Sequence, residues 1–144
     1  MRSIERLKRR LSRQEGAAAV EFAIVAMVFL LFLYGIITYG FIFGLDQSIN
    51  HAAEEGARAA ISQPTEALAI SYATSTAINR LSWLGANIQP GDVVATVDDC
   101  LLDTSVRCIT VTITYPWATR PLVPKLATLP QPSQMVASAV VGLT

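Results

Sequence analysis

The feature that most constrains the fold is an uninterrupted apolar run from Phe22 to Leu45, which holds 24 residues and no charged side chain. As an α-helix, which rises about 1.5 Å per residue, this run would be roughly 36 Å long. The hydrocarbon core of a bilayer is about 30 Å thick, so such a helix is long enough to cross it. The sequence therefore predicts one transmembrane segment at about residues 22–45.

Charge is distributed unevenly around this run, although the chain as a whole is neutral. Residues 1–16 carry six Lys or Arg against two Glu, a net charge of +4, and residues 17–144 carry five against nine, a net charge of −4. Basic residues are typical of the cytoplasmic flank of a membrane helix. We therefore expect a cytoplasmic N-terminus and an external C-terminal region. The basic segment has no interleaved aromatic residues, so nucleic acid is not an expected partner.

A secretory signal peptide also combines a basic start with an apolar stretch. Its apolar region spans about 7 to 15 residues and is followed by a small-residue cleavage site. Here the run is longer, and the nearest Ala-x-Ala after it begins only at Ala57. The small residues precede the run instead, at residues 16–19, and this pattern disfavours a signal peptide.

Residues 16–22 have the sequence GAAAVEF, which resembles a prepilin processing site, where a basic leader ends in Gly and Glu is fifth in the mature chain. Together with Gly35, Gly40 and the stretch AAEEGAR at residues 52–58, this motif resembles the TadE-like pseudopilins of bacterial tight-adherence pili. The resemblance covers residues 16–60 closely and is loose beyond them. It implies cleavage by a prepilin peptidase between Gly16 and Ala17, and a role in assembly for Glu21 and Phe22.

The resemblance also implies a function and a place in the cell. The chain is expected to be a pilin-like structural protein and not an enzyme. Because the major pilins of these systems are much shorter, it is expected to be a minor pilin or pseudopilin. It would take part in assembling type IVb pili for surface adhesion. Its expected partners are the prepilin peptidase, other pilins and pseudopilins, the inner-membrane assembly platform and the lipid bilayer, with no cofactor. It would cross the bacterial inner membrane once, with its C-terminal domain in the periplasm, and could also enter the extracellular pilus.

Glu21 has more than one physical interpretation. A charged side chain at the centre of a bilayer costs about 2.5 to 3.5 kcal/mol unless it finds a partner. Glu21 could instead lie at the cytoplasmic interface in water, or pair with the Ala17 amine that cleavage would create. That amine could belong to the same chain, four residues away, or to a neighbouring subunit. The sequence leaves these alternatives open.

The helical pattern continues beyond the membrane segment. Apolar residues recur at spacings of three and four up to about Ser62, and Glu54 is placed to reach Arg58. Pro64 then suits the first turn of a second helix from Thr65 to Leu84, which Gly85 would end. The expected buried face of this second helix consists of Ile70, Ala73, Ala77, Leu81 and Leu84.

The remaining residues predict a small antiparallel sheet. Residues 93–99 and 106–115 alternate apolar and polar side chains, as half-buried strands do, and form a predicted hairpin. Residues 116–132 contain five prolines and read as an irregular loop, and residues 134–141 could add a third strand. The fold class is therefore α+β and pilin-like, with a leader at 1–16, a long helix at 17–62 and an external domain at 63–144.

Cys100 and Cys108 are expected to face each other directly across this hairpin, at a separation that a disulfide can bridge. An oxidising external compartment would favour the bond, although two reduced thiols remain the alternative. In the chain-entropy model, closing so short a loop stabilises a domain by roughly 2 to 3 kcal/mol. The spacing does not fit a Cys-x-x-Cys redox motif, and the chain has only one histidine to support a zinc site.

No catalytic set is evident in the sequence. His51, the sole histidine, is flanked by Asn50 and alanines without a recognisable nucleophile and carboxylate pattern. The group Asp98, Asp99 and Asp103 lacks the spacing of a calcium loop. A membrane-bound hydrolase is thus poorly supported. The stronger alternative to a pilin is a permanently anchored periplasmic binding module, which would keep residues 1–16 and recruit a partner protein.

Overall fold

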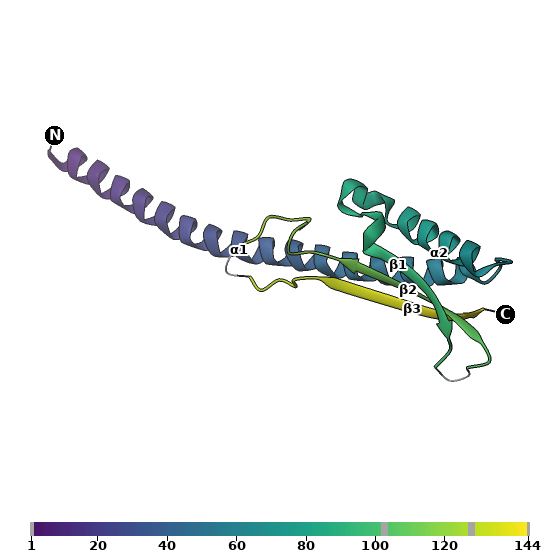
Figure 1. Ribbon diagram of the computed structural model, residues 1–144. Helices are drawn as coiled ribbons and strands as arrows, with labels where there is room; N and C mark the ends of the chain where they lie inside the picture. Colours follow the sequence, from purple (N-terminus) through teal and green to yellow (C-terminus); the bar gives the residue numbers. More distant parts are fainter. Residues whose placement is uncertain (1, 102–103, 127–128, 144) are drawn as a thin grey trace. The chain divides into compact units, whose positions relative to one another are not determined.

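The computed structural model describes residues 2–101, 104–126 and 129–143, with side chains from Gly16 onward. Its elements are the α-helices α1 (Arg2–Ala60) and α2 (Glu66–Arg80), the short 3-10 helices η1 (Ser82–Asn87) and η2 (Pro90–Asp92), and the strands β1 (Val93–Asp99), β2 (Arg107–Tyr115) and β3 (Met135–Leu143). Figure 1 labels the α-helices and the strands. This inventory confirms the predicted α+β class. The chain divides into two compact units, Met1–Gly40 and Phe41–Thr144.

The first unit consists of the N-terminal part of α1. Its described apolar side chains are largely exposed, including Phe22 at 74% and Met27 at 73%. Within the described residues, Gly16–Ala60 is the one helical segment whose length and composition would allow it to cross a membrane. A run of exposed Phe, Leu, Ile and Val requires an apolar environment, which a bilayer or a bundle of similar helices would supply.

In the second unit, α1 and α2 pack closely through small side chains. Gly56 lies at the contact: a Cβ atom added there would stand 2.8 Å from the Ala73 carbonyl oxygen and 3.1 Å from the Ala77 Cβ. On α2 the buried residues are Ala69, Ala73 and Ala77. The predicted face of this helix is thus correct at Ala73 and Ala77, whereas Ile70 is only partly buried and Ala69 lies inside.

The ends of α2 differ from the prediction. Pro64 lies outside the helix, since Thr65 is the N-cap and its hydroxyl accepts a hydrogen bond from the Leu68 amide at 3.3 Å. A Thr side chain satisfies an amide that the first helical turn leaves free, which fixes the start there. The helix ends at Arg80, before the predicted Leu84, and η1 follows. Gly85 lies within η1 at φ 55°, a backbone conformation that favours glycine.

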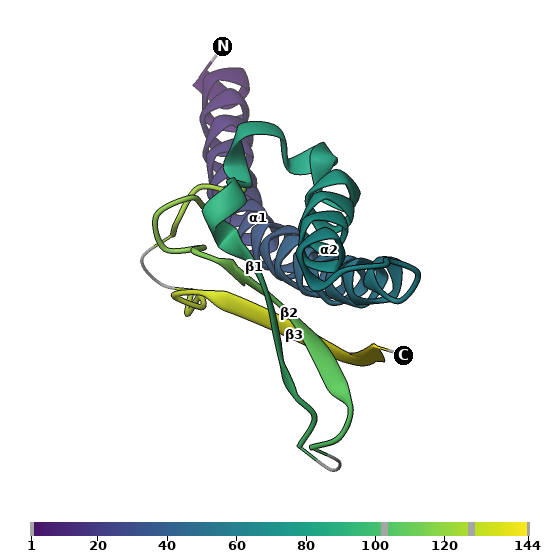
Figure 2. The ribbon, with the colours of Figure 1, turned by 45° about the vertical axis from the view of Figure 1, so that its right-hand side comes forward.

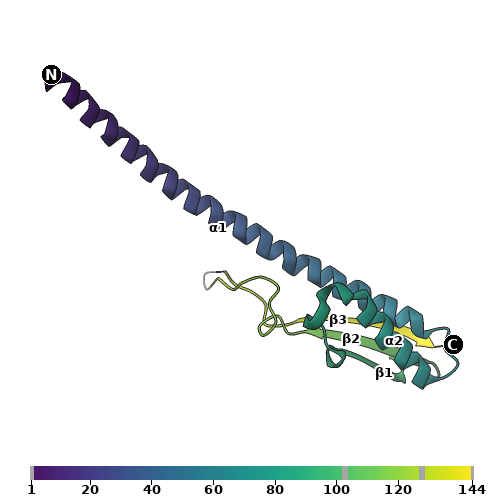
Figure 3. The ribbon, with the colours of Figure 1, turned by 90° about the horizontal axis from the view of Figure 1, so that it is seen from above.

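The sheet is antiparallel, with β2 between β1 and β3 (Figure 3). Strand β1 coincides with the predicted 93–99, and β3, at 135–143, confirms the third strand that was predicted at 134–141. On β2, alternate side chains are fully buried, as the sequence pattern predicts for a strand with one inner face. Helix α2 packs on β1 and β2. The fully buried core residues of β2 and of α1 are Ile109, Val111, Ile113, Tyr115, Leu45, Ile49, Ala52, Ala57 and Ala60.

Cys100 and Cys108 are joined by a disulfide at the end of the β1–β2 hairpin, with their Cα atoms 5.0 Å apart. The expected direct opposition of the two cysteines is wrong. Cys108 pairs with Asp98, and the Cys100 amide bonds to the Val106 carbonyl, so the bond runs diagonally across the ladder. Diagonal residues share a face of the sheet, and this allows the two sulfurs to meet.

An ion pair fixes the segment between β2 and β3 to the start of β1. The Arg120 guanidinium donates to both carboxylate oxygens of Asp92, at 2.6 and 2.8 Å, and to the Asn87 carbonyl at 2.6 Å. Tyr115 donates its hydroxyl to the Arg120 carbonyl at 2.7 Å. Burial acts to raise the pKa of Asp92, but the Arg120 and Gln89 hydrogen bonds and the Arg120 charge together hold it below its usual range.

We expect Arg120→Ala to lower the free energy of unfolding by about 3 kcal/mol, because it leaves a partly buried carboxylate without its partner.

The pKa of Asp92 is depressed in the folded state, so its contribution to stability is complete above the unfolded pKa of about 3.9 and is lost as the pH falls toward the folded value. In the Asp92→Asn variant, the free energy of unfolding should therefore fall less between pH 5 and pH 3 than in the wild-type chain. Thermal unfolding at several pH values would measure this difference. Asp98→Asn, on the exposed side of β1, should leave the free energy of unfolding at pH 7 unchanged. A loss as large as that expected for Arg120→Ala would contradict this account.

Candidate assembly site

The predicted processing motif, residues 16–22, lies within the helix α1, and all seven residues are exposed. The helix has no break at the predicted cleavage point between Gly16 and Ala17. Cleavage would therefore require a local opening of this turn, or processing before it forms. The basic side chains of residues 2–13, on which the predicted leader depends, lie outside the described side chains.

Glu21 stands four residues after Ala17, so the two lie on one face of the helix, one turn apart. Among the described side chains from Gly16 onward, none makes a hydrogen bond or an ion pair with the Glu21 carboxylate. The uncleaved chain has a peptide nitrogen at Ala17, which carries no charge. Cleavage after Gly16 would convert this nitrogen into an ammonium group and so place a cation one helical turn from Glu21.

Three glycines of the apolar segment, Gly35, Gly40 and Gly44, have open space where a Cβ would lie, with no heavy atom within 4 Å. Packing inside the chain does not explain their lack of a side chain, which sets them apart from Gly56. Small residues on membrane helices allow neighbouring helices to approach closely. These three positions are therefore candidates for contacts with other chains.

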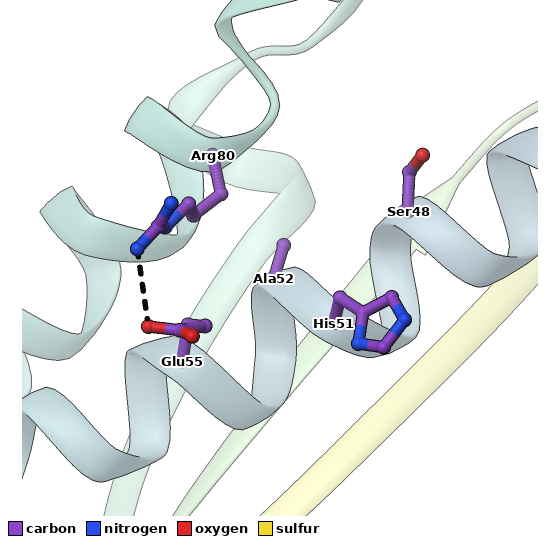
Figure 4. Close-up of a pocket in the computed structure, with 5 residues that line it drawn as sticks. All are labelled: Ser48, His51, Ala52, Glu55 and Arg80. Atoms are coloured by element: carbon purple, nitrogen blue, oxygen red, sulfur yellow. Dashed lines mark hydrogen bonds and ion pairs between the residues drawn. The ribbon is translucent and has the colours of Figure 1, made fainter.

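His51 lines a shallow groove of about 260 Å³ with Ser48, Ala52, Glu55 and Arg80, shown in Figure 4. The Ser48 hydroxyl donates to the Gly44 carbonyl at 2.8 Å, and Arg80 pairs with Glu55 at 3.3 Å. This arrangement engages the serine and the carboxylate with other partners, and gives His51 no nucleophile to activate. The predicted pair of Glu54 and Arg58 is absent from the ion pairs of the described residues; Glu55 and Arg80 instead connect α1 to α2.

The acidic residues at the end of the hairpin, Asp98, Asp99 and Asp103, do not form a single cluster among the described residues. Asp99 pairs with Arg107 at 2.7 Å, and Arg107 also pairs with Glu66 at 3.0 Å, while Asp103 lies outside the described residues. The hydrogen bonds that the Arg107 guanidinium donates to Glu66 and Asp99 raise the pKa of Arg107. No cluster of three or more potential metal ligands occurs in the part of the chain that the structure describes. Sequence reasoning missed the Glu66 contact, because 41 residues separate its partners and no local spacing indicates it.

The family model described as TadE-like protein matches residues 16–58. No curated protein and no solved structure matches the chain. The matched segment begins at Gly16 and contains Glu21, Phe22 and the glycines Gly35, Gly40 and Gly44. It also extends to Gly56, the point of contact with α2. The match thus covers the residues of the candidate assembly site and stops before the sheet.

Proposed function

We propose that this chain, which matches the TadE-like family model over residues 16–58, is a structural protein of tight-adherence pili and, more specifically, a minor pilin or pseudopilin. In this proposal a prepilin peptidase removes residues 1–16, and the mature subunit takes part in assembling a pilus for adhesion. The observation that carries the proposal is the position of the match, which starts at Gly16, immediately before a membrane-length apolar helix.

The exposed apolar surface of α1 suits two environments in succession. Before assembly, the residues from Phe22 onward would lie in lipid, with the basic N-terminus in the cytoplasm. After assembly, the same residues would pack against the helices of other pilins, where Gly35, Gly40 and Gly44 would let helix backbones approach. One apolar stripe would thus serve first as a membrane anchor and then as filament core.

Cleavage would supply the partner that Glu21 lacks in the uncleaved chain. The new Ala17 amine of one subunit could pair with Glu21 of its neighbour, which would neutralise both charges in an apolar core and set the register between subunits. The competing arrangement is a pair within one chain, where Ala17 and the positive end of the helix dipole stand one turn away. The two arrangements differ in whether Glu21 is needed for assembly.

The region after the apolar helix would then lie outside the cytoplasm. The disulfide between Cys100 and Cys108 supports this placement, because structural disulfides persist in oxidising compartments such as the periplasm. The outer domain would be carried at the end of the anchored helix and, after assembly, at the pilus surface.

The proposal is tested by Gly16→Leu, which puts a large side chain at the cleavage bond. We expect this variant to keep its leader, remain in the membrane and fall at least about tenfold in sheared pili, by quantitative immunoblotting. Ala19→Leu makes a similar change three residues away and should be cleaved and incorporated like the wild-type chain. A wild-type chain that keeps residues 1–16 and never reaches pili would contradict the proposal and support a permanently anchored binding module.

A further inference from the structure

The loop between β2 and β3 contains a pocket that the proposed function does not use. The pocket has a volume of about 340 Å³, and its lining includes Ala118, Lys125, Leu126, Leu129, Gln131 and Pro132. Proline fixes the backbone angle φ, so the five prolines between residues 116 and 132 stiffen this loop. The Ala118 amide donates a hydrogen bond to the Ser133 carbonyl at 2.8 Å, which joins the two ends of the loop. The walls of the pocket are therefore largely preformed.

Two hydrogen-bond donors of this lining can take an acceptor from outside the chain. Gln131 accepts a hydrogen bond from the buried Trp117 indole at 3.0 Å through Oε1, but its Nε2 is buried and has no partner among the described residues. Among the ion pairs of the described residues, none includes the Lys125 ammonium, which donates to the Ala118 carbonyl. Because a buried donor without an acceptor destabilises a structure, a ligand that supplies acceptor oxygens is favoured here.

The charge and the apolar walls of the pocket indicate which ligand it suits. Lys125 is the one charged residue among the described lining residues, which include no Asp or Glu. An ammonium group beside an amide donor suits an anion with several acceptor oxygens, such as a phosphodiester. Leu126 and Leu129 line the same pocket, and a hydrogen bond from the Leu129 amide to the Leu126 carbonyl connects them at 3.1 Å. An anion that carries hydrocarbon chains meets both requirements.

The loop lies at the end of the second unit where α1 enters it. Figures 1 and 2 show the loop at one end of β3, and the C-terminus with the end of α1 at the other. From Phe41 to Ala60, α1 is roughly 30 Å long, about the length of the nine-residue β3. Phe41 is therefore at the same end as the loop. If residues 22–45 cross a bilayer, this end of the second unit faces the lipid headgroups.

We propose that the pocket binds an anionic phospholipid from the membrane leaflet that faces the second unit. Lys125 and the Gln131 amide donate hydrogen bonds to the phosphodiester, and Leu126 and Leu129 contact the first carbons of an acyl chain. The bound lipid holds this end of the second unit at the bilayer surface. The proposal rests on the anchoring of α1 in a membrane, and is independent of cleavage after Gly16 and of entry into pili.

The test is native mass spectrometry of the full-length chain in a non-ionic detergent with added phosphatidylglycerol, which measures the dissociation constant of the first bound lipid. Gln131→Glu keeps an oxygen for the Trp117 hydrogen bond and replaces the amide donor with a second carboxylate oxygen, which repels the phosphate. We expect this variant and Lys125→Gln each to raise the dissociation constant at least about tenfold. Lys125→Arg, which keeps the charge, should bind the lipid within about threefold of the wild-type chain.

Arg58→Gln is the matched control, because it removes one positive charge at an exposed position outside the pocket. It should leave the dissociation constant unchanged, and melting temperatures would show that every variant folds. An equal loss of binding in Arg58→Gln and Lys125→Gln would overturn the proposal, since net charge alone would then explain it. Competition by millimolar inorganic phosphate, or equal affinity for phosphatidylcholine, would also overturn it. A chain that keeps residues 1–16 can still bind the lipid, so this result and that of the cleavage test are separate.

Discussion

Glu21→Gln should leave membrane insertion and cleavage after Gly16 intact and yet reduce the amount of this chain in sheared pili by at least about tenfold. The change removes the charge with little change in shape. If Glu21 pairs with the Ala17 amine of a neighbouring subunit, the variant loses a charge-assisted hydrogen bond, which contributes about 1.5 to 3 kcal/mol. Each 1.4 kcal/mol corresponds to a factor of ten in an equilibrium constant, so the loss should be readily measured.

The measurement compares the chain in sheared pili with the chain in the membrane pool, by quantitative immunoblotting. Glu15→Gln is the control, because it makes the same change in a residue that cleavage would discard, and its incorporation should match the wild type. Cleavage of both variants is verified by intact mass. Wild-type incorporation of Glu21→Gln would favour pairing within one chain, and would remove Glu21 from the contact between subunits.

Gly56→Leu should destabilise the second unit by about 3 kcal/mol, because α1 and α2 leave no room for a large side chain between them. Even a Cβ atom would stand 2.8 Å from the Ala73 carbonyl oxygen, a backbone atom that can move away only if the helix moves. Overpacking a close contact costs about 1 to 3 kcal/mol, occasionally more. Gly56→Ala would recover up to about 1 kcal/mol in helix propensity, so its net loss should be smaller.

Thermal unfolding of the detergent-solubilised chain measures this effect, with the fluorescence of the buried Trp117 as a probe. A loss of 1 kcal/mol lowers the melting temperature of a domain of this size by about 4 to 8 °C. Gly44→Ala is the matched control, since Gly44 lies in the same helix and has no heavy atom within 4 Å of the added Cβ. If Gly56→Ala and Gly44→Ala were equally stable, the two helices would not be held at the distance that the structure shows.

Periodic patterns in the sequence were sufficient to predict most of the fold. β1 was predicted at its observed bounds and β2 to within one residue, because apolar and polar residues alternate there over a full strand. The end of α1 was placed within two residues, since Gln63 and Pro64 interrupt the helical spacing. Such signals are local: each depends on residues that are neighbours along the chain.

The differences arise where one specific hydrogen bond, or a contact between distant segments, decides the structure. Thr65 is the N-cap of α2 because its hydroxyl accepts a hydrogen bond from the Leu68 amide. The preceding Pro64 led us to expect the proline in the first turn of the helix instead. The register of the hairpin, fixed by pairs such as Asp98 with Cys108, makes the disulfide diagonal. The ion pair of Asp92 and Arg120 joins residues 28 apart, and nothing in their local spacing indicates it.

The candidate assembly site could be predicted as a motif but not as a set of contacts. The sequence placed Ala17, Glu21 and Phe22 on one helix with Gly16 just before it, whereas in the structure α1 contains all four residues, all exposed. Their proposed partners are a peptidase, a bilayer and other subunits. Interactions with such partners arise between molecules, so neither the sequence pattern nor the fold of a single chain can contain them.

The most direct test of the account is the N-terminus of the protein isolated from cells that have an active prepilin peptidase. Intact mass together with N-terminal sequencing should give a chain that starts at Ala17 and has lost residues 1–16. The same cells without the peptidase should give the longer chain. Recovery of protein that still contains Met1 from cells with the active enzyme would contradict the account, because Glu21 would then have no Ala17 amine to pair with.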